Sequence, residues 1–143
     1  MAIRQVSVFV ENRKGALADA LRTLSDAGIG LRALSIADTR DFGILRIITD
    51  DNRKAAMALS EADYICSATE VVAAAADDKP GGLAALLTIL SDAGIDVEYV
   101  YAFVAEAKKH ACVVLRVNDN EAAEAVLKKA GISLITEEDI MGI

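Results

Sequence analysis

The chain has 143 residues, a formal net charge of −7 and a hydrophobic fraction of 54%, which is enough to build the core of one ordinary domain or of two very small ones. The acidic charge argues against a nucleic-acid partner, because phosphate backbones are bound mainly by clustered Lys and Arg. Apolar runs such as residues 71–76 are far shorter than the roughly 20 residues of a membrane helix, and the first residues do not resemble a signal peptide. We therefore expect a globular cytoplasmic protein that binds neither nucleic acid nor membrane.

The first half of the chain predicts a strand, a helix, two strands, a helix and a strand, in that order. Apolar residues alternate up to residue 10, which is typical of a half-buried strand. After residue 15, leucines recur at spacings of four and three, which is typical of one buried helix face. Two β-rich runs in residues 29–51 are joined by a turn at residues 38–41, and a second helix follows with Asp51 as its expected N-cap. Residues 63–70 then predict the final strand.

The second half repeats the first. The sequence LSDAGI occurs twice, and placing Gly81 over Gly15 makes about two thirds of the neighbouring helix positions identical. The same elements follow in the same order: a strand, a helix, a hairpin, a second helix with Asn118 as its expected N-cap, and a final strand in residues 131–138. The duplication therefore predicts two copies of one small fold.

Each copy has the order βαββαβ, and the copies are expected in residues 1–68 and 69–143. This order is the ferredoxin-like pattern, an α+β fold in which two helices cover one face of a four-stranded antiparallel sheet. One copy of about 70 residues is a marginal folding unit by itself. A second copy is therefore expected to cover a sheet face or an edge strand that one copy leaves exposed.

The loops between the first strand and first helix of each copy, residues 11–17 (loop 1) and 77–83 (loop 2), have the residues for binding a small anion. A helix N-terminus presents unpaired N–H groups and a partial positive charge, and a glycine there lets an anion approach without meeting a Cβ atom. Asn12 in one loop and Asp78 in the other provide oxygen acceptors for an ammonium group. Together these groups suit both ends of a free amino acid, although glycine at such a turn is also common for backbone reasons alone.

The two copies resemble the ACT domain, a small-molecule-binding regulatory module of amino-acid metabolism. The resemblance is carried by the segment DKPGGLAALLTILSDAGIDV, by its copy NRKGALADALRTLSDAGIGL and by the βαββαβ order, and it covers nearly the whole chain. It implies a non-catalytic protein without a cofactor that binds an amino acid near the interface between paired ACT units, forms a homodimer and regulates a partner enzyme of amino-acid metabolism. The ligand-binding residues that it implies are Asp78, Pro80, Gly81, Gly82, Leu83, Ile95, Asn12, Gly15 and Ala16.

Loop 2 matches the ACT motif better than loop 1 does. In loop 1, Lys14 replaces Pro80, Ala16 replaces Gly82, and Arg13 beside Lys14 makes the loop cationic. If one site has lost its ligand or changed its preference, we expect it to be loop 1. The two cations could equally suit an acidic ligand.

Other readings of the sequence remain open. A stand-alone ACT protein can serve as an assembly module without a ligand, and RNA-binding domains share the βαββαβ order, although the acidic charge disfavours that class. For catalysis, the single histidine, His110, offers no triad or zinc site, and nothing in the spacing singles out Asp96 or Glu98.

Aromatic residues alternate along the first strand of the second hairpin. Tyr99, Tyr101 and Phe103 are expected on one sheet face with Val97 in phase. We expect them to pack in the core or an interface, although a tyrosine hydroxyl could also line a cleft.

Overall fold

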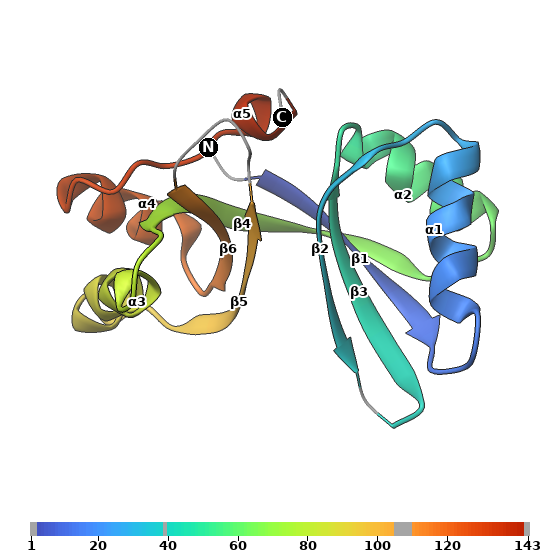
Figure 1. The fold of residues 1–143 in the computed structure, drawn as a ribbon, viewed down its shortest axis with the longest axis horizontal. Coiled ribbons are helices and arrows are strands. Elements are labelled where there is room, and N and C mark those ends of the chain that lie inside the picture. The colour runs from blue at the N-terminus through green and yellow to red at the C-terminus, as the bar shows by residue number, and fades with distance from the viewer. Residues whose placement is uncertain (1–2, 39, 105–109, 142–143) are drawn as a thin grey trace. The chain divides into compact units, whose positions relative to one another are not determined.

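The computed structural model of the chain describes residues 3–38, 40–104 and 110–141 (Figure 1). The chain forms two compact units, the first comprising Arg4–Thr69 and the second comprising Glu70–Ile143 together with Met1–Ile3. Strand β4 (Cys66–Asp77) passes from one unit into the other. The domain limits at residues 1–68 and 69–143 stay a prediction.

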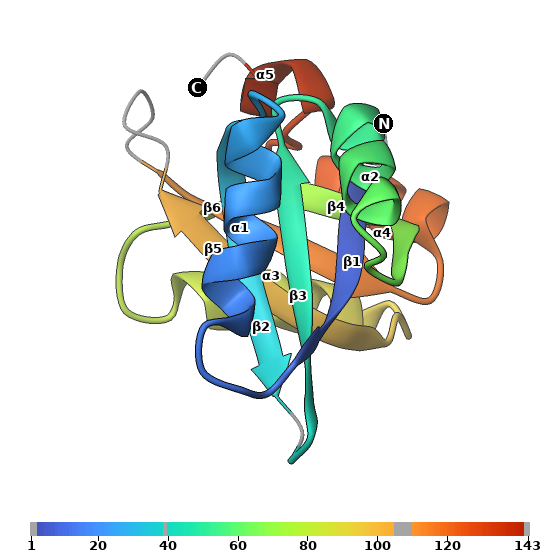
Figure 2. The same cartoon turned by 90° about the vertical axis from the view of Figure 1, so that its right-hand side faces the viewer.

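The first unit has the predicted order of elements. They are β1 (Ile3–Glu11), α1 (Ala16–Asp26), β2 (Leu31–Asp38), β3 (Phe42–Thr49), α2 (Asn52–Glu61) and the start of β4. The strand order is β2-β3-β1-β4, and β3 pairs antiparallel with both β1 and β2. The helices α1 and α2 cover one face of this sheet (Figure 2).

The core of the first unit follows from the alternation along β1. Val6, Val8 and Val10 point to the helix face and are buried against one side of α1, where Ala20 and Leu24 are also buried. Complete burial of a valine or leucine side chain stabilises a fold by about 1.5–3 kcal/mol relative to its exposure. The alternating apolar residues of the strand therefore pack against the helix residues spaced three to four apart, in one layer between the sheet and the helices.

The second unit repeats this arrangement with one difference at its end. Its elements are the rest of β4, α3 (Gly82–Asp92), β5 (Val97–Val104), β6 (His110–Val117), α4 (Asn120–Lys129) and α5 (Glu137–Met141). The strand order is β4-β6-β5, with antiparallel pairing at both junctions. Its core contains buried residues of β4, β6, α3 and α4. The turn expected in the second hairpin, residues 105–109, lies outside the described residues.

The predicted final strand of the second copy is wrong. Residues 131–138 form only an isolated antiparallel bridge between Ala74 and Leu134, and a short helix, α5, starts directly afterwards. The reason is local: the Thr136 amide donates to Asp139 Oδ2 at 3.0 Å, and the Asp139 amide donates to Thr136 Oγ1 at 3.1 Å. This reciprocal capping box begins a helix where the strand would have continued.

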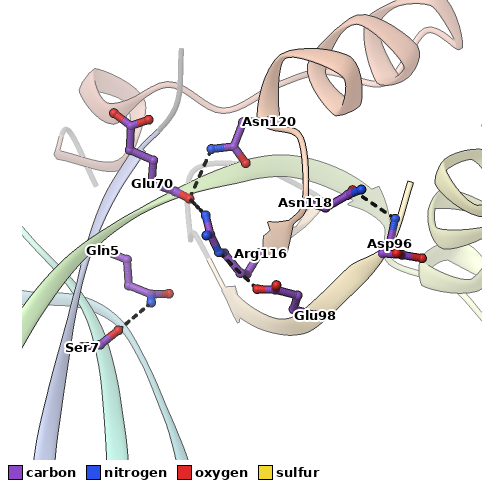
Figure 3. Close-up of polar contacts among 8 residues, drawn as sticks. All are labelled: Gln5, Ser7, Glu70, Asp96, Glu98, Arg116, Asn118 and Asn120. Carbon is purple, nitrogen blue, oxygen red and sulfur yellow. Dashed lines mark hydrogen bonds and ion pairs between the residues drawn. The ribbon is translucent and has the colours of Figure 1, made fainter. Parts of the chain in front are cut away.

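The predicted N-cap of α4, Asn118, is also wrong by one residue. Asp119 caps the helix, while Asn118 Oδ1 accepts a hydrogen bond from the Asp96 amide at 3.2 Å (Figure 3). The first copy contains the equivalent hydrogen bond, which the Gly30 amide donates to Asp50 Oδ1 at 3.1 Å. In both copies this residue therefore joins the start of the second strand to the end of the third, while its neighbour caps the helix.

Tyr99, Tyr101 and Phe103 lie on β5 as expected, but Val97 is not in phase with them. The rings of Tyr99 and Tyr101 stack with centroids 6.5 Å apart, and Phe103 is buried. Val97 instead packs against the core of the second unit, because the register shifts between Val97 and Tyr99.

Candidate functional site

Loops 1 and 2 share one backbone conformation. The residue before each helix, Gly15 or Gly81, is left-handed, with φ of 84° and 85° respectively. This region favours glycine because a Cβ atom is strained there. A Cβ atom built on either glycine would meet no atom of the described residues within 4 Å. Each helix therefore begins next to open space, as an anion site at its N-terminus requires.

The hydrogen bonds of the two loops also match. In loop 1 the Arg13 amide donates to the Glu11 carbonyl at 2.9 Å, and the Ala16 amide donates to the Arg13 carbonyl at 3.2 Å. The same two bonds occur in loop 2, from Lys79 to Asp77 at 2.9 Å and from Gly82 to Lys79 at 3.0 Å. The geometry of the loop is therefore set by the end of the strand and by the glycine.

Neither helix has a side-chain cap at its start. After the first amide, the next protein acceptor inside the described chain is the glycine carbonyl, which binds the amides of Asp19 and Ala85 at 2.9 Å. The intervening amides of the first turn, those of Leu17 and Leu83 among them, receive no protein acceptor among the described residues. They carry the partial positive charge of the helix end.

The difference between Ala16 and Gly82 has a steric cause. Ala16 is buried at the start of α1, so its Cβ atom fits the first copy. A Cβ atom on Gly82 would overlap the backbone oxygen of Asp77. The second glycine of loop 2, which the resemblance assigns to the ligand site, is therefore also required by the backbone.

The side chains expected to receive an ammonium group differ in their surroundings. Asn12 lies against the β2–β3 turn, where its side-chain amide donates to the Arg40 carbonyl at 3.2 Å and its backbone amide donates to the Asp41 carbonyl at 3.0 Å. Asp78 is exposed, and its carboxylate has no partner among the described residues. Pro80, beside it, is exposed as well. Asn12 thus joins loop 1 to the hairpin by two hydrogen bonds, whereas in loop 2 the described structure gives the exposed Asp78 carboxylate no partner.

A pocket of about 150 Å³ lies beside loop 1. Its polar wall is formed by loop residues, and its apolar wall by β1, α1, β2 and β3. The polar wall consists of Glu11, Asn12 and Arg13, and the rest of the lining consists of Val10, Leu17, Ile36, Gly43 and Leu45. Sequence reasoning missed Ile36 and Gly43, which it placed only in a hairpin. They reach loop 1 because β2 runs back along α1, so the far end of the hairpin returns to the start of the helix.

Two of the predicted site residues are not close together within the second unit. Ile95 follows the C-terminal end of α3 and is buried in the core, whereas Gly81 precedes its N-terminal end. The 11 residues of α3 extend over about 16 Å. Leu83, in the first turn of the helix, is partly exposed and lies at the loop end. Within this unit, loop 2 and the start of its second strand therefore do not form one site.

The carboxylates considered for catalysis have structural neighbours. Glu98 accepts from Arg116 Nε at 3.2 Å, and the Arg116 guanidinium also donates to the Glu70 carbonyl at 3.0 Å (Figure 3). The Asp96 amide donates a hydrogen bond to Asn118 Oδ1, as described above. No group of three or more His, Cys, Asp and Glu residues that could hold a metal is found within residues 3–38, 40–104 and 110–141. His110 begins β6, but its side chain lies outside the described part of the chain.

The family model described as an ACT domain pair matches residues 1–143. The solved structure of protein BT0572 from Bacteroides thetaiotaomicron is 36% identical, with a TM-score of 0.92, and the match covers 100% of this chain and 98% of that chain. No curated protein gives a significant match. In the described ranges, none of the helices has the length and apolar character needed to span a membrane.

Two further solved structures share the fold at lower identity. The ligand-free regulatory subunit of aspartate kinase from Thermus thermophilus is 16% identical, with a TM-score of 0.64 and 90% of each chain covered. E. coli aspartokinase III in complex with lysine and aspartate is 19% identical, with a TM-score of 0.52 over 90% of this chain and 30% of that chain.

Proposed function

Since this chain belongs to the ACT domain pair family, we propose that it is a non-catalytic regulatory module that binds a free amino acid at its strand-to-helix loops. The observation that carries the proposal is the shared geometry at the N-termini of α1 and α3, where Gly15 and Gly81 face open space beside uncapped helix amides. The amides suit the carboxylate of the ligand, and Asp78 or the polar wall of loop 1 suits its ammonium group.

The proposal includes a homodimer and a partner enzyme of amino-acid metabolism. Support for the enzyme comes from the fold neighbours, which include a regulatory subunit of aspartate kinase and an aspartokinase solved with lysine and aspartate. Regulation requires that the ligand favours one assembly or partner-bound state over another, typically by about 1–3 kcal/mol. Sedimentation at several protein concentrations, with and without amino acid, tests the dimer.

A thermal-shift screen against the twenty amino acids, followed by isothermal titration calorimetry of the hits, tests ligand binding. A ligand at 100 times its Kd stabilises the folded state by about 2.7 kcal/mol, which corresponds to a Tm rise of roughly 5–10 °C for a chain of this size. If none of the twenty binds a sample whose fold is confirmed by circular dichroism, the proposal is wrong. The alternative, a ligand-free assembly module that regulates a partner, would then be favoured.

Asp78→Ala tests the site in loop 2. The side chain is exposed and unpartnered within the described chain, so its removal should leave the fold intact. Loss of one hydrogen bond to a charged group weakens binding by roughly 10–100-fold. Asp92→Ala, an exposed carboxylate at the other end of α3, is the matched control and should bind normally. Equal affinity of Asp78→Ala and wild type would exclude this carboxylate from the site.

A further inference from the structure

We propose that the pocket beside loop 1 selects amino acids with a compact aliphatic side chain, of the size of valine, leucine or isoleucine. The inference rests on the proposed function and gives it a ligand class. Two of the apolar wall residues, Val10 and Leu45, are buried, and Leu17 and Ile36 complete the wall. Away from loop 1, the lining residues whose side chains the structure describes are all apolar. A ligand side chain placed against them meets alkyl groups, so a polar group there would lose its hydrogen bonds to water without replacement.

The charges at the mouth of the pocket suit a zwitterion and disfavour an acidic side chain. Arg13 Nε lies 2.9 Å from Glu11 Oε2, so the one cation among the lining residues is already neighboured by a carboxylate. The formal charges of these two residues cancel. Lys14 is exposed and does not line the pocket. An amino acid with one carboxylate and one ammonium group finds a partner of each sign, whereas a second carboxylate would find no second cation among the described lining residues.

The size of the pocket favours a compact side chain. Its volume of about 150 Å³ is below the roughly 300–1,000 Å³ of pockets that hold drug-sized ligands. Gly43 contributes to this space. A Cβ atom built there would lie 3.6 Å from Ile36 Cγ2, in ordinary contact. An alanine is therefore tolerated by the fold at position 43 and narrows the pocket.

The second copy differs at these positions, so the selectivity belongs to the first copy. The strand registers are equivalent, since Ile36 lies opposite Leu45 and Ala102 lies opposite Val113. Smaller residues replace three of the wall residues, and an alanine replaces the glycine. The equivalents of Val10, Ile36, Gly43 and Leu45 are Ala76, Ala102, Ala111 and Val113.

Calorimetric titration of the full chain with L-valine, L-leucine, L-isoleucine, L-alanine, L-threonine, L-aspartate, L-lysine and L-phenylalanine tests the inference. We expect one of the first three to bind at least 10-fold more tightly than alanine, since one or two methylene groups in an apolar pocket change affinity by about 10–200-fold. Tighter binding of aspartate, lysine or phenylalanine would overturn the inference while the proposed function stands. If none of these eight binds and the thermal-shift screen of all twenty amino acids gives no hit, both are overturned.

Two substitutions place the site in the first copy. Gly43→Ala should weaken binding of leucine or isoleucine at least 10-fold while L-alanine binding is retained, and Ile36→Ala should weaken binding of all three aliphatic ligands. Ala111→Gly, at the equivalent position of the second copy, is the control and should leave these affinities unchanged. Thermal melts confirm that each variant is folded. Aliphatic binding that survives both Gly43→Ala and Ile36→Ala unchanged would refute the assignment to this pocket.

Discussion

Gly82→Ala is expected to destabilise the second unit, although alanine is the better helix former. Within a helix, alanine is more favourable than glycine by up to about 1 kcal/mol. In this chain, however, a Cβ atom at position 82 would overlap the backbone oxygen of Asp77 and lie 3.0 Å from its backbone carbon. Both atoms belong to the main chain at the end of β4, so no side-chain rotation relieves the overlap.

The magnitude follows from the shift that is needed. Moving the start of α3 away from β4 is comparable with overpacking a core, which costs about 1–3 kcal/mol. Because the overlap is with main-chain atoms, we take the upper part of this range, about 2–3 kcal/mol, and subtraction of a helix-propensity gain of about 1 kcal/mol leaves an expected fall in the free energy of unfolding of about 1–2 kcal/mol. A chain of this size should then lose roughly 2–8 °C in Tm. The reverse change at the equivalent position, Ala16→Gly, should also destabilise, because the first copy buries that methyl group.

Urea unfolding followed by circular dichroism measures both changes, with thermal melts as a second readout. We expect opposite substitutions at equivalent positions, Gly82→Ala and Ala16→Gly, both to lower the unfolding midpoint. A Gly82→Ala variant as stable as the wild type, or more stable, would refute it. In that case loop 2 has room for the methyl group, and its second glycine would have to be explained by the ligand alone.

Three further predictions concern stability and can be measured in the same urea titrations. Asp51→Ala and Asp119→Ala should each lower the free energy of unfolding by about 1 kcal/mol, because both side chains accept a hydrogen bond from the first turn of their helix; unchanged midpoints would exclude a capping role. Asp63→Gly should raise it by up to about 1 kcal/mol, since Asp63 is left-handed with φ of 68° where the second copy has Gly131, and a fall would contradict this. Ile140→Ala should cost about 2–4 kcal/mol because the side chain is fully buried, and a loss below 1 kcal/mol would show that α5 contributes little.

The elements of both copies could be predicted from the sequence because each depends on a local signal. The alternation in β1, the leucine spacing in α1 and the glycines at 15 and 81 act within a few residues of the structure that they produce. Gly15 and Gly81 are predicted at the starts of the first helices and are found there, and their left-handed conformation is an addition from the structure. Asp51 was likewise correctly predicted as the N-cap of α2.

Errors occurred where two local signals compete or where a register shifts. Asn118 and Asp119 are both residue types that commonly cap helices. Asn118 accepts a hydrogen bond from the Asp96 amide, and Asp119 caps α4. The sequence alone does not show this division. The alternation of Val97 with Tyr99 ignored the register shift between them. A shift at the equivalent place in the first copy, between Leu31 and Ala33, shows that the irregularity belongs to the fold. Since neither segment contains an obvious bulge residue, the pattern alone could not reveal it.

The lining of the pocket was missed because it depends on contacts between residues distant in the sequence. Ile36 and Gly43 are separated from loop 1 by the whole of α1, and their position follows only from the antiparallel return of the hairpin. Topological reasoning could have found them, since a strand that follows a helix runs back to the start of that helix. The side chain of Asn12, whose oxygen is predicted to accept from an ammonium group, donates through Nδ2 to the Arg40 carbonyl on this hairpin, and the role of its oxygen stays a prediction.

Comparison of the two copies shows which residues the loop geometry requires and which residues can differ. Loops 1 and 2 have nearly equal glycine dihedrals and the same pair of backbone hydrogen bonds, although four of the five residues between Glu11 and Leu17 differ from their counterparts. The bonds are made by main-chain atoms, so a left-handed glycine is the one side-chain requirement common to both. Ile36 and its counterpart Ala102 can therefore differ without disturbing the start of the helix. If the chain binds an amino acid as proposed, one copy can change its ligand preference while the other keeps its own, and the Gly43→Ala and Ala111→Gly pair is designed to detect this asymmetry.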